Sequence, residues 1–183
     1  VRSREDFFTQ TYCHGSRFFH PKNGPRIHAV REAIARRELR PELEAVALVS
    51  LMEAADRVDS TTGVQMAYLK GWAPRALNDL DLRVPDVLPR AIAGKGLAVC
   101  MDAAAAAREL ASEADVVYID PPYNQHSYLG NYHIWETLVR WDAPEVYGTA
   151  CKRVDCRERK SAFNSRRAMR EAFEEVLDAC GDR

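Results

Sequence analysis

The stretch D-P-P-Y, from Asp120 to Tyr123, contains the residue types in this sequence best suited to chemistry on an amine. An exocyclic amine on a nucleobase is a poor nucleophile, because its lone pair is delocalised into the ring. The Asp120 carboxylate and the Pro121 carbonyl can each accept one N–H of such an amine and direct the lone pair at an electrophile. Pro122 restricts the backbone, and Tyr123 offers a face for a base pulled out of its stack, an interaction worth about 1–3 kcal/mol. The alternative interpretation is a plain turn that ends a strand.

Two short apolar runs indicate how these residues are positioned. One run, residues 115–119, leads directly into Asp120, and an earlier run, residues 97–101, leads into Asp102. An alanine-rich segment of helical character lies between them, so we expect a right-handed parallel βαβ unit. Both acids then lie at carboxyl ends of strands, the edge where open α/β sheets bind ligands. Asp102 can also cap the following helix, and the two roles can coexist.

The remainder of the chain is predicted to be mostly helical. Apolar spacing and first-turn prolines predict helices over residues 25–39 and 41–58, and further amphipathic helices over 130–140 and 164–180. We therefore expect an α/β fold with a partial parallel sheet and a largely helical N-terminal half. The expected division is a helical segment with a long connecting loop, residues 1–93, followed by a partial α/β domain with the D-P-P-Y motif, residues 94–183.

Composition restricts the function classes. The chain has 183 residues, 46% hydrophobic and 29% charged, which suits one domain with a core. Its net charge of −1 excludes binding nucleic acid through an overall positive field, so any such binding must use local patches. Residues 151–170 form one candidate patch with eight Lys and Arg, for which phosphate contact and a solvated helix face are about equally good interpretations.

Membrane and metal signals are weak. No apolar run reaches the roughly 20 residues of a membrane span, and the N-terminus lacks the apolar segment of a signal peptide, so a cytoplasmic location is expected. Five cysteines without a C-x-x-C pair predict reduced thiols. Cys13, His14 and His20 lie close in sequence, but zinc favours four ligands with recognisable spacing, so no metal site is expected.

The motif and its surroundings resemble a known family. The string "DVVYIDPPYNQHSYLGNYH" is similar to the fourth motif of the DPPY-type DNA adenine-N6 methyltransferases, which transfer a methyl group from S-adenosylmethionine to adenine in duplex DNA. Three further segments are similar to bacterial modification enzymes of this class, in the same order: "RFFHPKNGPRIHAVREAI", "LVSLMEAADRV…TTGVQMAYLKGW" and "RKSAFNSRRAMREAF".

The resemblance implies a fold and a set of roles. It implies part of a Rossmann-like methyltransferase sheet, with S-adenosylmethionine as cofactor and double-stranded DNA as partner, in some systems beside a cognate restriction endonuclease; residues 1–93 would include the target-recognition part. By the same resemblance, Asp120, Pro121, Pro122 and Tyr123 hold the target amine and base, and Asp102 and Asp120 meet the cofactor. The residues expected to contact DNA are Lys70, Lys160, Arg166 and Arg167.

The sequence also departs from the family pattern. A glycine-rich F-x-G-x-G loop, which approaches the methionine part of the cofactor, has no counterpart before Asp102. The chain also stops soon after the helix expected over 164–180, so we expect an enzyme truncated at both ends, completed by missing segments or a complementing chain. Two alternatives stay open: an RNA exocyclic-amine methyltransferase, and a non-catalytic DNA- or partner-binding remnant.

Overall fold

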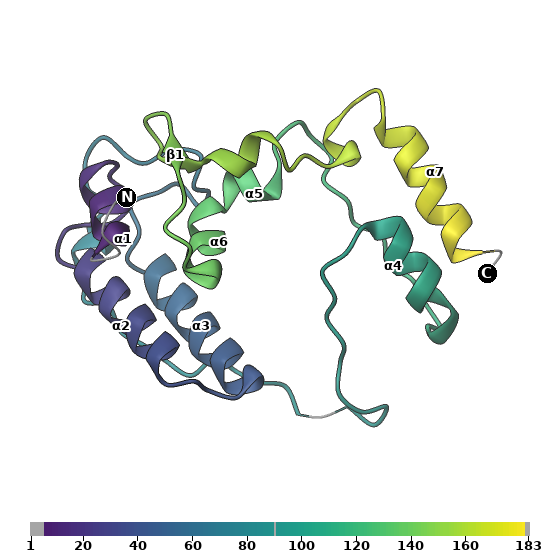
Figure 1. Cartoon of the computed structure of the whole chain (residues 1–183), viewed down its shortest axis with the longest axis horizontal. Helices are drawn as coiled ribbons and strands as arrows, with labels where there is room; N and C mark the ends of the chain where they lie inside the picture. The colour runs from purple at the N-terminus through teal and green to yellow at the C-terminus, as the bar shows by residue number, and fades with distance from the viewer. Residues whose placement is uncertain (1–5, 90, 182–183) are drawn as a thin grey trace. The chain divides into compact units, whose positions relative to one another are not determined.

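The structure is a computed structural model that describes residues 6–89 and 91–181. The chain divides into two compact units (Figure 1). Unit 1 contains residues 6–86 and Tyr128–Arg159, and unit 2 contains the described residues of 87–127 and 160–181. Residues 128–159 therefore follow the D-P-P-Y motif in sequence but fold with the N-terminal helices.

Two antiparallel helices form the framework of unit 1. Helix α2 spans Gly24–Arg36 and helix α3 spans Pro41–Asp56; each has a proline in its first turn, where the missing N–H has no partner to lose. Ile27 and Ile34 on α2 and Leu51 on α3 are buried, as their helical spacing predicted. The two expected N-terminal helices are thus confirmed.

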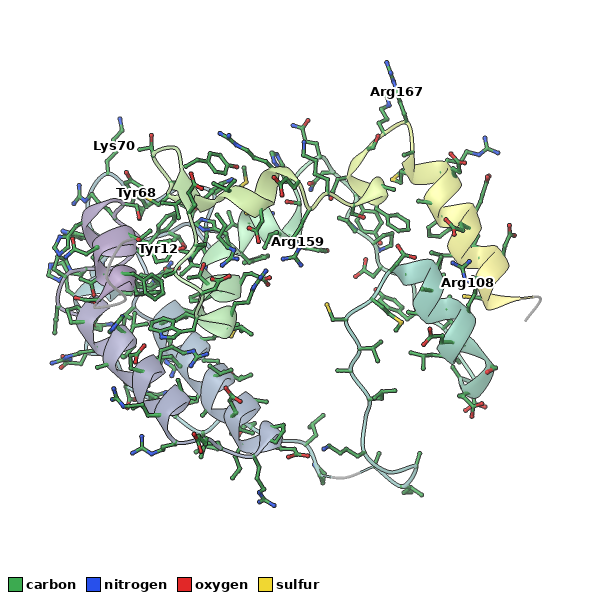
Figure 2. All side chains as sticks on the ribbon, in the orientation of Figure 1. Tyr12, Tyr68, Lys70, Arg108, Arg159 and Arg167 are labelled. Carbon is green, nitrogen blue, oxygen red and sulfur yellow. The ribbon has the colours of Figure 1, made fainter. Side chains whose placement is uncertain are left out.

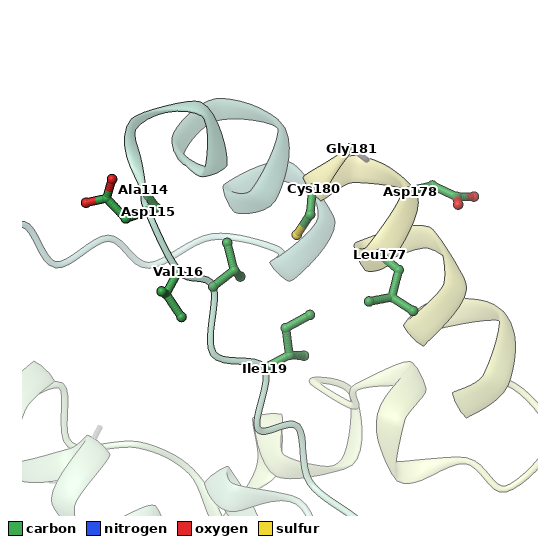
Figure 3. Close-up of a pocket in the computed structure, with 9 residues that line it drawn as sticks. Ala114, Asp115, Val116, Ile119, Leu177, Asp178, Cys180 and Gly181 are labelled. Carbon is green, nitrogen blue, oxygen red and sulfur yellow. The ribbon is translucent and has the colours of Figure 1, made fainter. Parts of the chain in front are cut away.

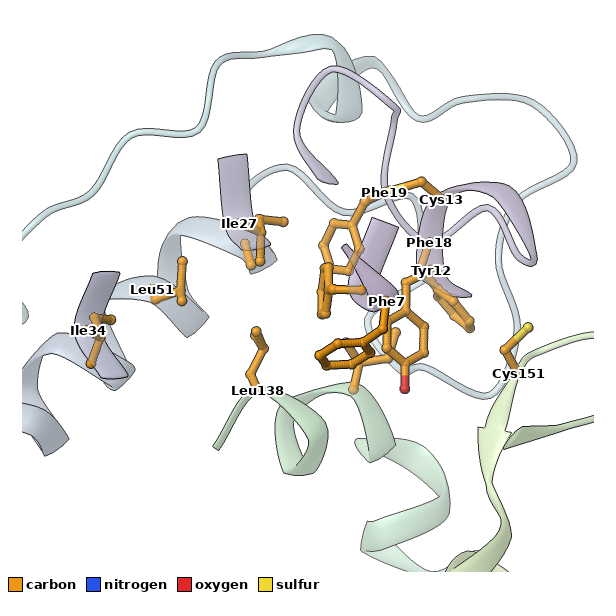
Figure 4. Close-up of a cluster of buried hydrophobic side chains, with 13 residues drawn as sticks. Phe7, Tyr12, Cys13, Phe18, Phe19, Ile27, Ile34, Leu51, Leu138 and Cys151 are labelled. Atoms are coloured by element: carbon orange, nitrogen blue, oxygen red, sulfur yellow. The ribbon is translucent and has the colours of Figure 1, made fainter. Parts of the chain in front are cut away.

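The N-terminal segment supplies most of the aromatic core (Figure 4). Helix α1, Phe7–Thr9, continues directly into a π-helical turn, η1, Gln10–His14. Gly24 permits α2 to start against this turn, because a Cβ at Gly24 would lie 2.2 Å from the Cys13 sulfur. The core consists of these buried side chains: Phe7, Phe8, Tyr12, Cys13, Phe18, Phe19, Ile27, Ile34, Leu51, Ala55, Ile134, Leu138 and Cys151.

The segment after the motif completes unit 1. It forms α5 (Tyr128–Asn131), α6 (His133–Arg140), strands β1 (Val146–Tyr147) and β2 (Lys152–Arg153), and the 3-10 turn η4 (Val154–Arg157). The single helix expected over 130–140 is therefore two short helices. Ile134 and Leu138 on α6 are fully buried. A second turn of 3-10 helix in unit 1, η2, spans Pro74–Leu77.

A buried arginine joins the β-hairpin to α6. Arg153 makes two hydrogen bonds to the Asp142 carboxylate, at 2.7 and 2.8 Å, and two to Asp155 at 3.1 Å. Hydrogen bonds from this guanidinium hold the pKa values of Asp142 and Asp155 below their usual range. Thr137 on α6 completes the network through the Tyr12 hydroxyl at 3.1 Å and Arg153 at 3.3 Å.

Unit 2 is built on two packed helices. Helix α4, Ala103–Leu110, continues into the 3-10 turn η3, Ala111–Glu113, and packs against α7, Met169–Cys180. An ion pair between Arg108 and Glu175 at 3.5 Å links them. Helix α7 starts five residues later than expected, because a separate 3-10 turn, η5, Ala162–Asn164, precedes it.

The two expected parallel strands differ from the prediction. In the part of the chain that the structure describes, neither 97–101 nor 115–119 forms a strand, and the named sheet is the antiparallel pair β1–β2. A strand needs a neighbouring backbone for its ladder, and these segments are largely solvated: Leu97 is 75% exposed and Val116 84%. The chain is thus helix-rich with a small sheet, consistent with the α/β class, and the parallel pairing is not seen. No helix among the described residues is both long and apolar enough to cross a membrane.

Candidate active site

The D-P-P-Y motif lies in unit 2, in a segment without helix or strand. The Tyr123 hydroxyl donates a hydrogen bond to Oδ1 of Asp120 at 2.5 Å, and the Tyr123 residue is 72% exposed. The acid and the aromatic ring are therefore brought together by local chain geometry, three residues apart. The arrangement leaves the tyrosine accessible to a planar ligand and the carboxylate available as an acceptor.

A side chain from far along the sequence braces the end of this loop. The Asn164 side-chain amide donates to the backbone carbonyl of Asn124 at 2.9 Å and to that of His126 at 3.2 Å. The Asn124 side chain in turn accepts from the His126 N–H at 2.8 Å. Residues 124–126 are thus tied to η5. Sequence analysis missed Asn164, although it lies in the similar segment "RKSAFNSRRAMREAF".

Asp102 caps helix α4. Its Oδ1 accepts from the N–H groups of Ala104 and Ala105 at 3.0 and 3.2 Å, the pattern of an N-cap. Among the described residues, Oδ2 makes no hydrogen bond and remains an available acceptor. Capping is therefore compatible with a second role for Asp102, and its chemistry fits the hydroxyl or amine groups of a nucleoside cofactor.

A hollow of about 720 Å³ lies beside the extended segment that leads to the motif (Figure 3). Val116, Val117 and Ile119 line one side of it, and Leu177 and Cys180 on α7 line the other. Neither Asp102 nor Asp120 borders it. Asp115 and Asp178 also line the hollow, so it is a mixed polar and apolar space between this segment and α7, and the residues expected to meet the cofactor lie elsewhere.

The four residues expected to contact DNA are divided between the units. Lys70 lies in unit 1, and Lys160, Arg166 and Arg167 lie in unit 2. All four are exposed, and within the described residues none forms an ion pair. Figure 2 shows Lys70 and Arg167 pointing away from their ribbons into solvent. Their charges are available for a polyanion.

No metal site is found among the residues that the structure describes. Cys13 is buried in the core, and burial raises the pKa of its thiol to about 12. A thiolate ligand is therefore disfavoured at this position. Cys13 instead packs in the hydrophobic core of unit 1.

One buried glutamine links the loop after α3 to the segment after the motif. The Gln65 N–H donates to the Asn131 carbonyl at 2.6 Å, and the Gln65 side chain accepts from the Ile134 N–H at 2.8 Å. The carbonyl of Gln65 bonds Nε2 of His133 at 3.0 Å. A glutamine is mostly found exposed, so the sequence did not indicate that Gln65 is buried and makes these three hydrogen bonds.

Comparison with known proteins defines the class. The chain matches the family of D12 class N6 adenine-specific DNA methyltransferases over residues 1–179. It is 34% identical over 96% of its length to the type II methyltransferase M.FokI of Planomicrobium okeanokoites, and covers 28% of that protein. The modification methylase StsI of Streptococcus sanguinis is 35% identical over 70% of the chain, which covers 20% of it. The type II methyltransferase M.NlaIII of Neisseria lactamica is 34% identical over 76% of the chain, with 43% of the relative covered. No solved structure matches the chain.

These similarities agree with the residues of the motif. The chain belongs to the D12 class N6 adenine-specific DNA methyltransferase family, as the motifs predicted. It spans between 20% and 43% of the length of the three relatives described above.

Proposed function

We propose that this chain carries the adenine-capturing part of an S-adenosylmethionine-dependent DNA adenine-N6 methyltransferase. The observation that carries the proposal is the D-P-P-Y loop, in which Asp120 and an exposed Tyr123 lie within hydrogen-bonding distance of each other. Membership of the D12 class supports the same chemistry. The division into two compact units, one of which carries the motif, suits a division between catalysis and target recognition.

In the proposed mechanism, the base leaves the duplex and stacks on the Tyr123 ring. Its amine donates one N–H to the Asp120 carboxylate and one to the Pro121 carbonyl, which withdraws the nitrogen lone pair from the ring. The hydrogen bond from Tyr123 to Asp120 opens or shifts as the amine takes its place. Pro122 restricts the backbone, so the two acceptors need little reorganisation when the base arrives.

Asp102 and Asp120 have side chains suited to binding S-adenosylmethionine. S-adenosylmethionine, when bound, supplies the electrophilic methyl group. Asp102 would hold its nucleoside part through the carboxylate oxygen left over from helix capping, and Asp120 would face it from the motif. Residues 97–101 and 115–119 would act as neighbouring parallel strands of a Rossmann-like sheet, which explains their exposed apolar side chains.

The partners follow from the same assignment. Duplex DNA would be contacted by Lys70, Lys160, Arg166 and Arg167, and residues 1–93 would contain part of the recognition surface. The edges of the proposed strands, residues 97–101 and 115–119, would suit pairing with further segments of the same enzyme or with a complementing chain. The names of the relatives, modification methylase and type II methyltransferase, favour a cognate restriction endonuclease in the same cell, and a cytoplasmic site of action.

Calorimetric titration of S-adenosylmethionine into the 183-residue chain, with and without unmethylated duplex DNA, tests the proposal. We expect saturable cofactor binding that weakens in Asp102→Ala, while the capping-competent variant Asp102→Ser keeps the fold of α4. Absence of cofactor binding would overturn the cofactor assignment. DNA binding without cofactor binding would instead identify a non-catalytic DNA-binding module, and tighter binding to RNA would favour an RNA substrate.

A further inference from the structure

Unit 1 groups Lys70 with three further side chains in an arrangement suited to a polyanion. The guanidinium carbon of Arg17 lies 4.6 Å from the centroid of the Trp72 ring, and its NH1 donates to the Lys70 carbonyl at 2.5 Å. The His20 ring packs edge-on against Trp72, with centroids 4.9 Å apart. We call these four residues, Arg17, His20, Lys70 and Trp72, the Arg17–Trp72 cluster.

The positive charges of this cluster are not neutralised. Within the described chain, neither Arg17 nor Lys70 forms an ion pair, whereas the nearby Lys22 and Arg26 share the Asp79 carboxylate at 3.0 and 2.7 Å. Most other arginines of unit 1 that are exposed also have acidic neighbours. In this described part of the chain, the cluster thus places two cations without acidic partners beside an aromatic ring.

The cluster is also held in place. The N–H of Leu69 donates to the Ser60 carbonyl at 2.9 Å, and the Ser60 hydroxyl accepts from the Ala73 N–H at 3.1 Å. Just before Leu69, the Tyr68 ring packs edge-on against the buried Phe18, with the ring centroids 5.3 Å apart. Lys70 thus projects from a fixed backbone, and Figure 2 shows its side chain directed into solvent.

We propose that the Arg17–Trp72 cluster binds the phosphate backbone of duplex DNA, an inference that rests on the proposed function. Stacking on Trp72 fixes the plane of the Arg17 guanidinium, whose other N–H groups are suited to phosphate oxygens. Lys70 adds a second cation beside it. Gln65, earlier in the loop that carries Lys70, bonds Asn131, His133 and Ile134, so this loop is also tied to the segment after the D-P-P-Y motif.

The test is fluorescence anisotropy of a labelled duplex DNA with the 183-residue chain at a series of NaCl concentrations. Arg17→Ala and Lys70→Ala are each expected to weaken binding several-fold and to lower the salt slope by about one. The matched control is Arg36→Ala, which removes an exposed arginine already paired with Glu32. Circular dichroism checks folding; if Arg17→Ala does not fold, Lys70→Ala and Lys70→Glu carry the test, because Lys70 is an exposed side chain.

Three outcomes would overturn the inference, and one of them would also overturn the DNA substrate in the proposed function. If the unaltered chain binds DNA but Arg17→Ala and Lys70→Ala bind with the same affinity and salt slope, the cluster is not a phosphate site. Tighter binding to duplex RNA of the same sequence would assign the cluster to a different nucleic acid. Failure of the unaltered chain to bind duplex DNA at low salt would overturn both the inference and the proposed DNA substrate, so the two failures are distinguishable.

Discussion

The hydroxyl of Tyr123 donates a hydrogen bond to the carboxylate of Asp120 at 2.5 Å. The ring proposed to stack on a flipped base and the acid proposed to accept its amine are therefore joined before any base is present. Base entry has to replace this hydrogen bond with one from the incoming amine. The Tyr123 ring and its hydroxyl consequently have separable roles.

Substitution of Tyr123 separates these roles. Tyr123→Ala removes the stacking face and is expected to weaken capture of an extrahelical base by about 1–3 kcal/mol, with a smaller effect on cofactor binding. Tyr123→Phe keeps the face and should retain base capture. The measurement is the fluorescence of 2-aminopurine placed at the target position of the DNA, alongside cofactor calorimetry. Equal losses of base capture and cofactor binding in Tyr123→Ala would show that the tyrosine is structural.

Asn164 is predicted to position the loop that follows the motif. Asn164→Leu removes both hydrogen bonds to the carbonyls of Asn124 and His126, so the turnover number for methyl transfer should fall on the order of tenfold or more, as small misplacements of reacting groups do. The affinity for S-adenosylmethionine should change much less. Ser165→Ala, which alters the neighbouring exposed residue, serves as the control. A turnover number equal to that of the parent would remove Asn164 from the account.

His133 is predicted to make unit 1 sensitive to acid. Burial lowers the pKa of His133 from 6.5 to about 4. Its buried Nδ1 has no hydrogen-bond partner among the described residues, so a proton added there would have no acceptor. The unfolded chain therefore binds a proton at this residue first as the pH falls, so the free energy of unfolding drops between pH 6.5 and 4, by about 3 kcal/mol from this residue. Lys152 and Arg153 nearby disfavour the charged ring further.

Urea unfolding followed by tryptophan fluorescence at pH 7, 5.5 and 4.5 checks this prediction, because all three tryptophans lie in unit 1. His133→Asn should be less stable at pH 7 but should lose much of the dependence on pH. Replacement of the exposed His14 by Asn is the control and should keep the parent's dependence. An unchanged slope in His133→Asn would mean that other groups cause the acid sensitivity.

We predict that position 24 must be glycine, because its backbone lies close against the π-helical turn. A Cβ at this position would lie 2.2 Å from the Cys13 sulfur and 3.2 Å from the Thr9 hydroxyl, so Gly24→Ala should destabilise the chain by about 1–3 kcal/mol. Trimming the neighbour, in the double variant Gly24→Ala with Cys13→Ala, should cost less than the sum of the single changes. Strict additivity in thermal unfolding would contradict the proposed contact.

The helical parts of the fold could be predicted from sequence, and the paired parts could not. Helices α2 and α3 follow from local information, namely apolar spacing and a first-turn proline, and the Asp102 cap follows from an acid ahead of an alanine run. The strands expected over 97–101 and 115–119 depend on neighbours elsewhere in a sheet. Apolar periodicity indicates a tendency to pair and does not supply the partner.

In the candidate site too, contacts between residues close in sequence could be predicted and contacts between distant residues could not. Asp120 and Tyr123 are close in sequence, so the motif alone brings them together. Asn164 reaches the loop from 40 residues away, and Gln65 reaches the start of α6 across 68 to 69 residues. Single polar residues at such separations have no local pattern, and only the folded chain identifies them.

Analysis of the nucleosides produced from DNA shows directly whether the D-P-P-Y motif serves methylation of adenine at N6. Unmethylated duplex DNA is incubated with the chain and S-adenosylmethionine, digested, and analysed by mass spectrometry, with Asp120→Asn as the matched variant of nearly equal size. We expect N6-methyladenine with the parent chain once the segments that complete the enzyme are supplied, and none with Asp120→Asn under the same conditions, while the two chains have the same fold by circular dichroism. Absence of N6-methyladenine with the completed parent, its formation by Asp120→Asn at the parent's rate, or methylation confined to cytosine would contradict this expectation.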